Sequence, residues 1–422
     1  MHDDPTDRHY LTPLFAPASV AVIGASRRPN AVGAVLLANL RAAGYRGTLT
    51  AVNPKYREID GVPCIGTIGD APRRVDLAVI ATPPATVPGL VEACGEAGVR
   101  AVCVITAGFS ETGTDGARLE RAMLDAARRH GLRLLGPNCL GLMRPSIGLN
   151  ATFARGQAHV GALGLVSQSG AVCTAMLDWA APNGVGFSRV ISLGGSTDVD
   201  FGEIVDFLAN DPKTEHILLY IEGIRDARRF MSALRAAARV KPVILMKVGR
   251  QPAGSRAVVS HTGAMIGADD VFDAAVRRTG AVRVANIGQL VAAAQALSHR
   301  VKPRGARLAV VTNGGGPGVM AADRTADLGL ELSELAPATI AALKSALPSN
   351  WSHGNPVDLI GDADAARYGA ALEACLADPG VDGVLVILTP QAMTAPLEVA
   401  QAVVARAAAS RKPILTCWMG EA

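Results

Sequence analysis

Aromatic residues, net charge and long apolar runs are all scarce in this sequence of 422 residues. Phe, Trp and Tyr make up 4%, so the cores must be built mainly from Ala, Val, Leu and Ile. A formal net charge of +4 is too small to favour nucleic acid as a partner. No apolar run reaches membrane-span length, and the N-terminus MHDDPTDRHYLTP is unlike a signal peptide. We therefore expect a soluble chain with no membrane and no nucleic-acid partner.

Cysteine pairs are also lacking. Seven cysteines are scattered along the chain, and no two form a C-x-x-C motif. Most lie in apolar runs, where a free thiol behaves as a small hydrophobic side chain. This pattern argues against disulfides and against a zinc site, so no metal site is expected, and it favours a reducing cytoplasm.

Short apolar runs alternate with Ala-rich helical stretches, and each run ends in Gly, Pro, Ser or Asn. Examples are SVAVIGAS, LAVIATPP and AVCVITAGF. This alternation is typical of buried parallel strands joined by helices. From about residue 10 to 147 it predicts a Rossmann-like, doubly wound α/β unit, which we assign to a first domain over residues 1–150.

Two later units resemble each other. One opens with LGLVSQSGAV and the other with LAVVTNGGGPGV, and their later strands, NDPKTEHILLYIEG and ADPGVDGVLVILTP, also correspond. Corresponding elements in the same order indicate an internal duplication. We therefore expect two flavodoxin-like domains, over 151–303 and 304–422. The second copy stops soon after the strand in SRKPILTCWMG, so we expect the last domain to be truncated.

Three strand-to-helix turns could bind phosphate. VIGASRRPNAVG is not a G-x-G-x-x-G motif, but its backbone N–H groups and its arginines could hold an anion. Lys55 stands where a nicotinamide-binding strand would place an acidic residue, which suggests a ligand with extra phosphate near its ribose. The other two turns predict anion holes, with the alternative that they are only tight, capped turns. Their residues are Ser167, Ser169 and Gly170 in one turn, and Gly314, Gly315 and Gly316 in the other.

Glu222 and His261 are the candidate catalytic side chains. Glu222 follows the apolar strand in LLYIEG, and its alternative role is that of a carboxylate turned out to solvent. His261 lies in VVSHTGAMIGADD, where the plain alternative is an incidental residue at a helix start. A carboxylate that orients an imidazole makes its other ring nitrogen a better nucleophile.

Taken together, GPNCLG (136–141), VSQSGA and SHTGA resemble the acyl-CoA synthetases that form a nucleoside diphosphate. This family includes the ADP-forming acetate–CoA ligases and the succinyl-CoA synthetases, and the resemblance covers nearly the whole chain. It implies that His261 is phosphorylated during turnover, that Glu222 assists it and that Ser169 lies near the phosphate. It also implies CoA-contacting loops at Gly24, Ala25, Ser26, Arg27, Asn53, Lys55, Thr82, Pro83, Thr106 and Asn138.

The resemblance implies the reaction acid + CoA + ATP ⇌ acyl-CoA + ADP + phosphate, through an acyl phosphate and phosphohistidine. The family's ATP-grasp domain is lacking here, so ATP, ADP and Mg would act through a partner subunit or a further domain, in a homo- or hetero-oligomer. The substrate would be a small carboxylic acid. Two alternatives stay open: a CoA-sensing regulatory region, as in acetyltransferase fusions, and a nicotinamide dehydrogenase, which Lys55 disfavours.

Overall fold

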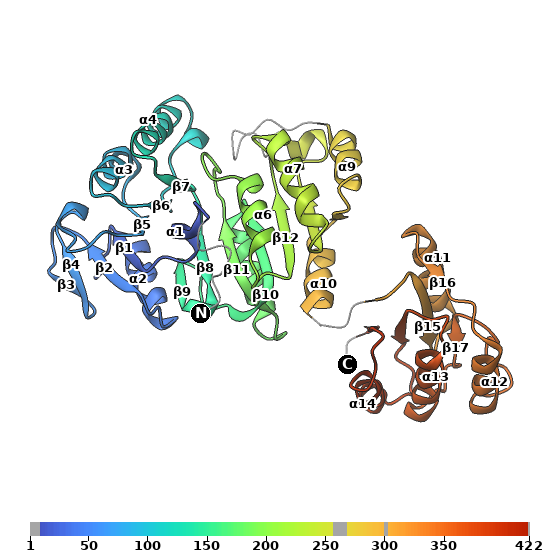
Figure 1. Ribbon diagram of the computed structural model, residues 1–422. Coiled ribbons are helices and arrows are strands. Elements are labelled where there is room, and N and C mark those ends of the chain that lie inside the picture. Colours follow the sequence, from blue (N-terminus) through green and yellow to red (C-terminus); the bar gives the residue numbers. More distant parts are fainter. Residues whose placement is uncertain (1–8, 256–267, 299–302, 421–422) are drawn as a thin grey trace. The chain divides into compact units, whose positions relative to one another are not determined.

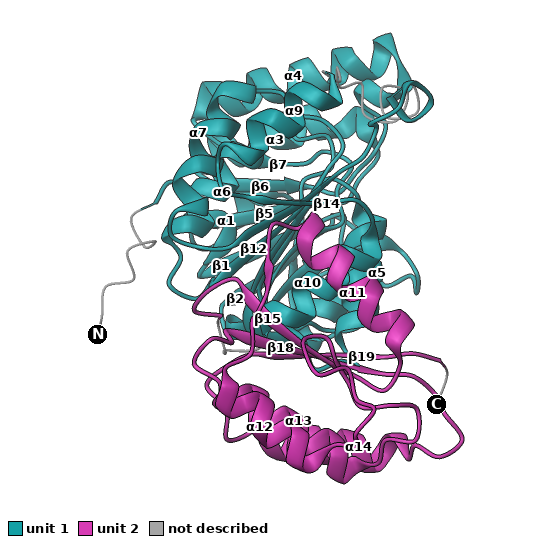
Figure 2. Ribbon diagram, turned by 90° about the vertical axis from the view of Figure 1, so that its right-hand side faces the viewer, with its two compact units in different colours: residues 1–298 teal, residues 299–422 magenta. Residues whose placement is uncertain are grey.

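The computed structural model describes residues 9–255, 268–298 and 303–420. It divides into unit 1, residues 1–298, and unit 2, residues 299–422 (Figures 1 and 2). His261 lies outside the described residues. No helix in the described ranges is long and apolar enough to cross a bilayer.

The first sheet of unit 1 has the order β3-β4-β2-β1-β5-β6-β7. The six strands from β4 to β7 are parallel, and their order is that of a doubly wound dinucleotide-binding fold. The strands are β1 Ser19–Ile23, β2 Thr48–Val52, β3 Glu58–Ile59, β4 Val62–Ile65, β5 Leu77–Ile80, β6 Ala101–Val104 and β7 Arg133–Leu135. The helices are α1 Thr12–Phe15, α2 Val32–Ala42, α3 Val87–Glu96 and α4 Thr114–His130.

Sequence signals at the helix ends explain where these helices stop. Helix α4 has Asp115 in its first turn and Arg128, Arg129 and His130 in its last turn, which suits the helix dipole. Gly131 follows it with a φ of 64°, the left-handed conformation that glycine adopts without strain. Apolar faces of α3 and α4 cover one side of the sheet, and α1 and α2 cover the other.

The second sheet of unit 1 has the order β14-β13-β12-β10-β11-β8-β9. Its strands are β8 Gly141–Arg144, β9 Leu149–Thr152, β10 His159–Ser167, β11 Gly186–Ser192, β12 His216–Ile221, β13 Val243–Lys247 and β14 Val282–Val284. Its helices are α5 Gly170–Ala180, α6 Phe201–Asn210, α7 Ala227–Ala238, α9 Asp269–Arg277 and α10 Ile287–Ser298. Strands β10 to β14 are parallel and flavodoxin-like in order, whereas β8 and β9 add as an antiparallel pair beside β11. The second sheet therefore begins before residue 150.

The sheet of unit 2 has the order β16-β15-β18-β19, with β17 also paired to β15. Its strands are β15 Arg307–Thr312, β16 Glu331–Leu332, β17 Val357–Asp358, β18 Gly383–Leu388 and β19 Ile414–Trp418. Its helices are α11 Gly315–Asp327, α12 Pro337–Ala346, α13 Ala365–Ala377 and α14 Pro396–Ala407. Helices α12, α13 and α14 lie along one face of this sheet, and α11 lies on the other (Figure 2). The strand order β16-β15-β18-β19 corresponds to the order β11-β10-β12-β13 in the second sheet of unit 1.

The likeness extends to individual hydrogen bonds. Ser167 Oγ accepts from Ser169 N at 3.1 Å, and Thr312 Oγ1 accepts from Gly314 N at 3.1 Å. In each unit the next residue is an amide that reaches the end of the third strand. Gln168 Oε1 accepts from Glu222 N, and Asn313 Oδ1 accepts from Thr389 N, both at 2.7 Å. The same turn therefore occurs twice, in the two segments whose sequences correspond.

The hydrophobic cores are built from the side chains that the composition makes available. One cluster of buried side chains joins the two sheets of unit 1 through residues of α2, β1, β10, α6 and α7. Aliphatic side chains dominate it, as the low aromatic content predicts. Six of the seven cysteines are buried, all seven are free, and only Cys417 is exposed. Burial raises the pKa of the Cys94, Cys173 and Cys375 thiols to about 12, so these thiols remain protonated at neutral pH.

One ion pair is fully buried in unit 1. Arg189 Nη2 lies 3.3 Å from Asp211 Oδ2, and both side chains have zero exposure. Asp211 also accepts from the Thr214 hydroxyl at 2.7 Å, and Arg189 Nη1 donates to Ser188 O at 3.1 Å. Removing one member of such a pair leaves a buried charge without its counter-charge, which is far more costly than losing a surface pair.

We expect Arg189→Met to destabilise unit 1 by about 3–5 kcal/mol, because Asp211 would remain as a buried carboxylate. Thermal unfolding followed by calorimetry measures this loss. The matched control is Arg118→Met, since Arg118 is exposed and lies 3.9 Å from Asp115; it should change stability by less than about 1 kcal/mol. Equal effects of the two substitutions would contradict a special role for the buried pair.

Candidate active site

The residues expected to contact CoA all follow strands of the first sheet. They lie after β1 (Gly24 to Arg27), β2 (Asn53 and Lys55), β5 (Thr82 and Pro83), β6 (Thr106) and β7 (Asn138). Because these strands are parallel, their carboxyl ends meet at one edge of the sheet, the edge where open α/β sheets bind ligands. The fold thus gathers residues that are more than a hundred positions apart in the sequence.

Glycine is required at the first of these turns. Gly24 has a φ of 92°, and a Cβ there would lie 2.5 Å from Ala81 O. Gly33, the second residue of α2, passes so close that a Cβ there would lie 2.0 Å from Gly24 O. Asn53 Nδ2 donates to Ala25 O at 2.7 Å and so ties the end of β2 to this turn. The backbone can therefore approach a ligand closely here.

The polar side chains of this edge differ in how free they are. Ser26 Oγ accepts from Arg28 N at 3.0 Å, which braces the turn. Arg27 donates to Glu58 O at 2.6 Å and stacks over the Tyr56 ring. Lys55 is exposed, and no ion pair holds its ammonium group in the described part of the chain. Lys55 is therefore available to an anionic group of a ligand.

The loops after β5, β6 and β7 are hydrogen-bonded to one another. Thr106 Oγ1 donates to Thr82 O at 2.7 Å, and Asn138 N donates to Thr106 O at 2.9 Å. Asn138 is exposed, with a φ of 55°, and Pro83 is exposed at the start of a short turn. These bonds hold the three loops together, and we call the surface formed by Thr82, Thr106 and Asn138 the ledge.

A cavity of about 620 Å³ opens where this ledge meets the second sheet. From the first sheet it is lined by Thr82, Thr106 and Asn138, and from the turn after β10 by Gln168, Ser169 and Gly170. Its apolar wall consists of Val32, Ile105, Leu140 and Phe153. The structure therefore brings together five residues that the sequence singled out (Thr82, Thr106, Asn138, Ser169 and Gly170).

The turn after β10 presents a helix N-terminus to this cavity. Ser169 is the N-cap of α5, and its Oγ accepts from Val172 N at 3.3 Å. The N–H groups of Gly170 and Ala171 belong to the first turn of α5, where an α-helix offers no carbonyl partner. Ser167 is fully buried, and its hydroxyl donates to Ser169 O at 2.8 Å, so it braces the turn from inside. The turn is both a capped turn and a place where an anion could bind.

Glu222 is buried, with 6% exposure, so the alternative of a carboxylate turned out to solvent is wrong. Its backbone N–H and that of Gly223 donate to Gln168 Oε1 at 2.7 and 2.9 Å. Burial raises the pKa of Tyr220, and the Glu222 charge raises it further. Burial also lowers the pKa of Lys247, partly offset by the charges of Asp269 and Glu222. Glu222 therefore lies in a crowded, charged region behind the turn after β10.

Two further parts of the expected site are not among the residues that line this cavity: one belongs to unit 2, and the other is outside the described residues. Gly314 is the N-cap of α11 in unit 2, and Gly315 and Gly316 are exposed at the start of that helix. Their turn repeats the turn of Ser167 to Gly170, as shown above. His261 lies outside the described residues, so its expected approach to Glu222 stays a prediction.

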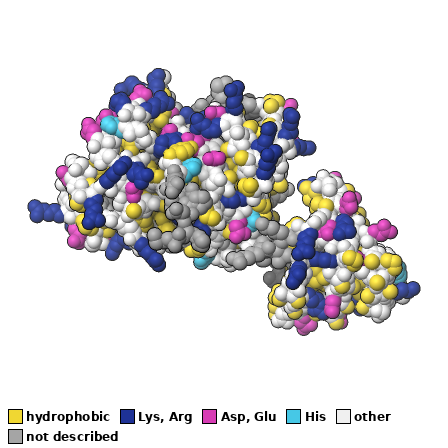
Figure 3. Space-filling model, viewed as in Figure 1, with side chains coloured by type: hydrophobic (Ala, Val, Ile, Leu, Met, Phe, Trp, Pro, Cys, Tyr) yellow, Lys and Arg dark blue, Asp and Glu magenta, His cyan; other side chains and the backbone are white. Residues whose placement is uncertain are grey.

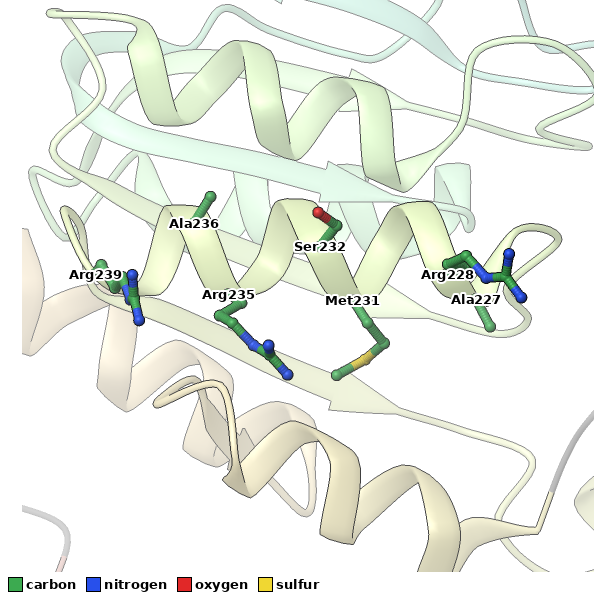
Figure 4. Close-up of a pocket in the computed structure, with 7 residues that line it drawn as sticks. All are labelled: Ala227, Arg228, Met231, Ser232, Arg235, Ala236 and Arg239. Atoms are coloured by element: carbon green, nitrogen blue, oxygen red, sulfur yellow. The ribbon is translucent and has the colours of Figure 1, made fainter.

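A second hollow, of about 540 Å³, lies on the outer face of α7. Figure 4 shows that all its lining side chains come from this one helix, including Arg228, Arg235 and Arg239. It includes no strand end and no second helix N-terminus. Charges of both signs are interspersed on the face of the protein drawn in Figure 3. The cavity between the sheets is the better candidate for chemistry.

Sequence reasoning did not find Gln168, Leu140 or Phe153 as residues of the cavity. In the sequence, Leu140 and Phe153 have the pattern of ordinary core or strand residues. Only the packing of the two sheets brings both of them to the cavity. Gln168 stands between two residues that were identified, and a polar side chain directly after a buried strand was a usable signal.

Three family models match the chain in the order of the three sheets. They are a CoA binding domain over residues 18–145, a Succinyl-CoA ligase like flavodoxin domain over 160–297 and a Ligase-CoA domain over 308–422. A CoA-binding α/β domain followed by ligase domains defines the class of CoA ligases.

The relatives narrow this class. The chain is 38% identical over 419 residues to acetate–CoA ligase (ADP-forming) I subunit alpha of Pyrococcus furiosus, covering 97% of this chain and 90% of that one. It is 44% identical over 407 residues to acetate–CoA ligase (ADP-forming) I of Archaeoglobus fulgidus, covering 96% of this chain but 58% of the relative. The chain thus spans little more than half of that longer relative. It belongs to the family of ADP-forming acetate–CoA ligases, which confirms the resemblance.

A solved structure agrees in fold. The dinucleotide forming acetyl-coenzyme A synthetase 1 of Ca. Korarchaeum cryptofilum, in complex with phosphate and ADP, matches with a TM-score of 0.92. The sequence identity is 35%, over 97% of this chain and 89% of that one. The expected fold class, a Rossmann-like domain followed by flavodoxin-like domains, is confirmed.

We expect Lys55→Glu to weaken CoA binding by about tenfold or more, because an attractive charge becomes repulsive at the ligand edge. Isothermal calorimetry at low and moderate salt measures this, and the difference should shrink as salt rises. Arg73→Glu is the matched control, since Arg73 is exposed just ahead of β5, at the opposite edge of the sheet. If both variants bind CoA as the unmodified chain does, Lys55 does not contact the ligand.

Proposed function

We propose that this chain is the CoA-binding and phosphohistidine part of an ADP-forming acid–CoA ligase. The reaction is acid + CoA + ATP ⇌ acyl-CoA + ADP + phosphate. The observation that carries the proposal is the cavity at which the CoA-binding edge (Thr82, Thr106, Asn138) meets the capped N-terminus of α5 at Ser169 and Gly170. The working domains are 1–150 for CoA, 151–303 for the phosphohistidine and 304–422 for the second ligase domain.

Two reaction steps lead from acyl-CoA and phosphate to the phosphorylated protein. A phosphate oxygen attacks the thioester carbonyl, the C–S bond breaks, and CoA leaves as a thiol after taking up a proton. The resulting acyl phosphate passes its phosphoryl group to His261. A P–N bond forms, the P–O bond to the acyl group breaks, and the acid leaves as its carboxylate. A neutral imidazole suits this task, since it is nucleophilic near pH 7 and leaves readily afterwards.

The residues of the cavity have distinct roles in this proposal. The N–H groups at the start of α5 and the Ser169 hydroxyl stabilise the charged phosphoryl group in place of water. Glu222 orients the His261 imidazole. Lys55 and the turn at Gly24 to Arg27 hold the phosphates of CoA, while the ledge of Thr82, Thr106 and Asn138 holds its thiol-bearing end. The lining residues fit such a chain, because hydroxyl and amide groups alternate with apolar side chains.

The nucleotide half of the reaction needs a further element. We propose an ATP-grasp subunit or domain that holds ATP or ADP with Mg and exchanges phosphate with His261. One relative is named a subunit alpha, which supports a separate partner, and the other is a longer chain. The acid of the proposed reaction is a small carboxylic acid, in keeping with the acetate that the names of these relatives give. The buried, free thiols favour a reducing compartment such as the cytoplasm.

We expect Ser169→Ala to slow phosphorylation of the protein by acyl-CoA and phosphate about 10- to 100-fold, because one donor to the phosphoryl group is lost. The substitution also removes the cap of α5, at a cost of about 1 kcal/mol. Asp364→Ala is the matched control: Asp364 caps α13 in unit 2 by accepting from Arg367 N. It should cost similar stability and leave the phosphorylation rate unchanged. Normal rates in Ser169→Ala would make the turn purely structural.

We expect His261→Ala and His261→Asn to abolish phosphorylation while CoA binding persists, because neither variant keeps the nucleophile. Acid-labile phosphate, located by mass spectrometry after exposure to acyl-CoA and phosphate or to ATP with the ATP-grasp part, is the measurement. His159→Ala, at the exposed start of β10, serves as the control. Stable label at another residue would instead favour a CoA-sensing role.

A further inference from the structure

Gln168 is the polar side chain of the cavity whose position is most tightly fixed. It has 8% exposure and lines the cavity next to Ser169. Its Oε1 accepts from two consecutive backbone N–H groups, those of Glu222 and Gly223, at 2.7 and 2.9 Å. Its own backbone N–H donates to Tyr220 O at 3.2 Å. Side chain and backbone are thus both bound to the end of β12.

These two bonds determine which way the amide faces. Only the oxygen of a glutamine amide accepts hydrogen bonds, so the atom beside the N–H groups of Glu222 and Gly223 must be Oε1. The Nε2 group is therefore turned away from β12. Gln168 is also a lining residue of the cavity, so an amide oriented in this way leaves its two N–H donors available on the cavity side.

The duplicate turn in unit 2 differs at this point. Asn313 Oδ1 likewise accepts from Thr389 N, at 2.7 Å, and its Nδ2 donates to Thr389 O at 3.0 Å. Both ends of that amide are therefore bound within the fold, and Asn313 is buried, with 1% exposure. The first copy has the longer glutamine, with its oxygen used for the same bond and its nitrogen left for the cavity.

We propose that Gln168 Nε2 binds the oxygen of the acyl group, donating to the thioester carbonyl of acyl-CoA and to the carboxylate oxygen of the acid. This inference rests on the proposed function. Ser169 and the start of α5 adjoin Gln168 in the chain, so the phosphate and the acyl carbonyl are held by neighbouring donors. Leu140 and Phe153 provide the apolar wall for the hydrocarbon part of the acid.

The role is catalytic because charge grows on the carbonyl oxygen when phosphate attacks. A donor that is fixed in advance stabilises this charge without reorganisation, and losing one such donor typically costs about 10²- to 10³-fold in rate. The hydrogen bonds from the backbone N–H groups of Glu222 and Gly223 hold the Gln168 amide in place. Transfer of phosphate between ATP and His261 involves no acyl group, so it should be independent of Nε2.

The test compares these two half-reactions in Gln168→Glu. The carboxylate still accepts from both backbone N–H groups, but it offers no donor to the cavity. With acetyl-CoA and inorganic phosphate, labelling of the protein should slow by about 10²-fold. With ATP and the ATP-grasp part, labelling should stay within about twofold of the unmodified protein. Calorimetry with CoA and thermal unfolding verify that the variant is folded.

Controls separate this role from a structural one. Asn313→Asp makes the same chemical change in the duplicate turn and should alter neither half-reaction selectively. Gln168→Asn withdraws the donor without adding charge, so it should also impair only the acetyl-CoA reaction; it replaces Gln168→Glu if that variant fails to fold. In Gln168→Glu the acetyl-CoA rate, relative to the unmodified protein, should recover as pH falls, because a protonated carboxyl group regains a donor.

An unchanged acetyl-CoA reaction in both Gln168 variants would overturn the proposal. An equal loss of both half-reactions would overturn it as well, since that outcome means Gln168 acts only by supporting Glu222. If the unmodified protein is labelled by neither route, the proposed function fails instead, which is a different result.

Discussion

The hydrogen bonds that join β7 and the loop after it to the segment after β11 are the constraint on which the site in unit 1 depends. Val199 N donates to Leu134 O, Thr197 N to Gly136 O and Gly195 N to Pro137 O. Arg133 adds charged bonds to Asp198 and Glu203, and these charges raise its pKa above the usual range although burial opposes them. Because of this seam, the carboxyl edges of two separate parallel sheets face one cavity.

The duplicated turn shows how one scaffold can serve two purposes. Ser167 and Thr312 brace their turns through the same pair of bonds, and Gln168 and Asn313 both anchor the turn to the third strand. The residue after that strand is Glu222 in unit 1 and Thr389 in unit 2. The copies thus share the bonds that shape the backbone and differ in the side chains that could do chemistry.

The cavity combines weak elements that only act together. By itself, a helix N-terminus attracts an anion only modestly. Within a partly closed space, fixed N–H donors interact more strongly with a developing charge than they do in water. Leu140 and Phe153 give this space an apolar wall. Family membership and this geometry both support the proposed function, in which an activated carboxylate is exchanged between phosphate and a thiol.

The central parallel strands, the doubly wound first domain and the repeated turns followed from the sequence alone, whereas the β8–β9 pair that extends the second sheet did not. Local apolar patterns and glycine or serine at strand ends specify these elements, and carboxyl ends of parallel strands necessarily share an edge. The sequence left two roles for Glu222, and only the packing of β12 behind the turn of Gln168 decided that its carboxylate is buried. The sequence did not indicate that Phe153 and Thr82 line the same cavity, because they follow strands of different sheets. Contacts of this kind depend on how whole layers pack, and no local pattern of residues encodes the seam that aligns them.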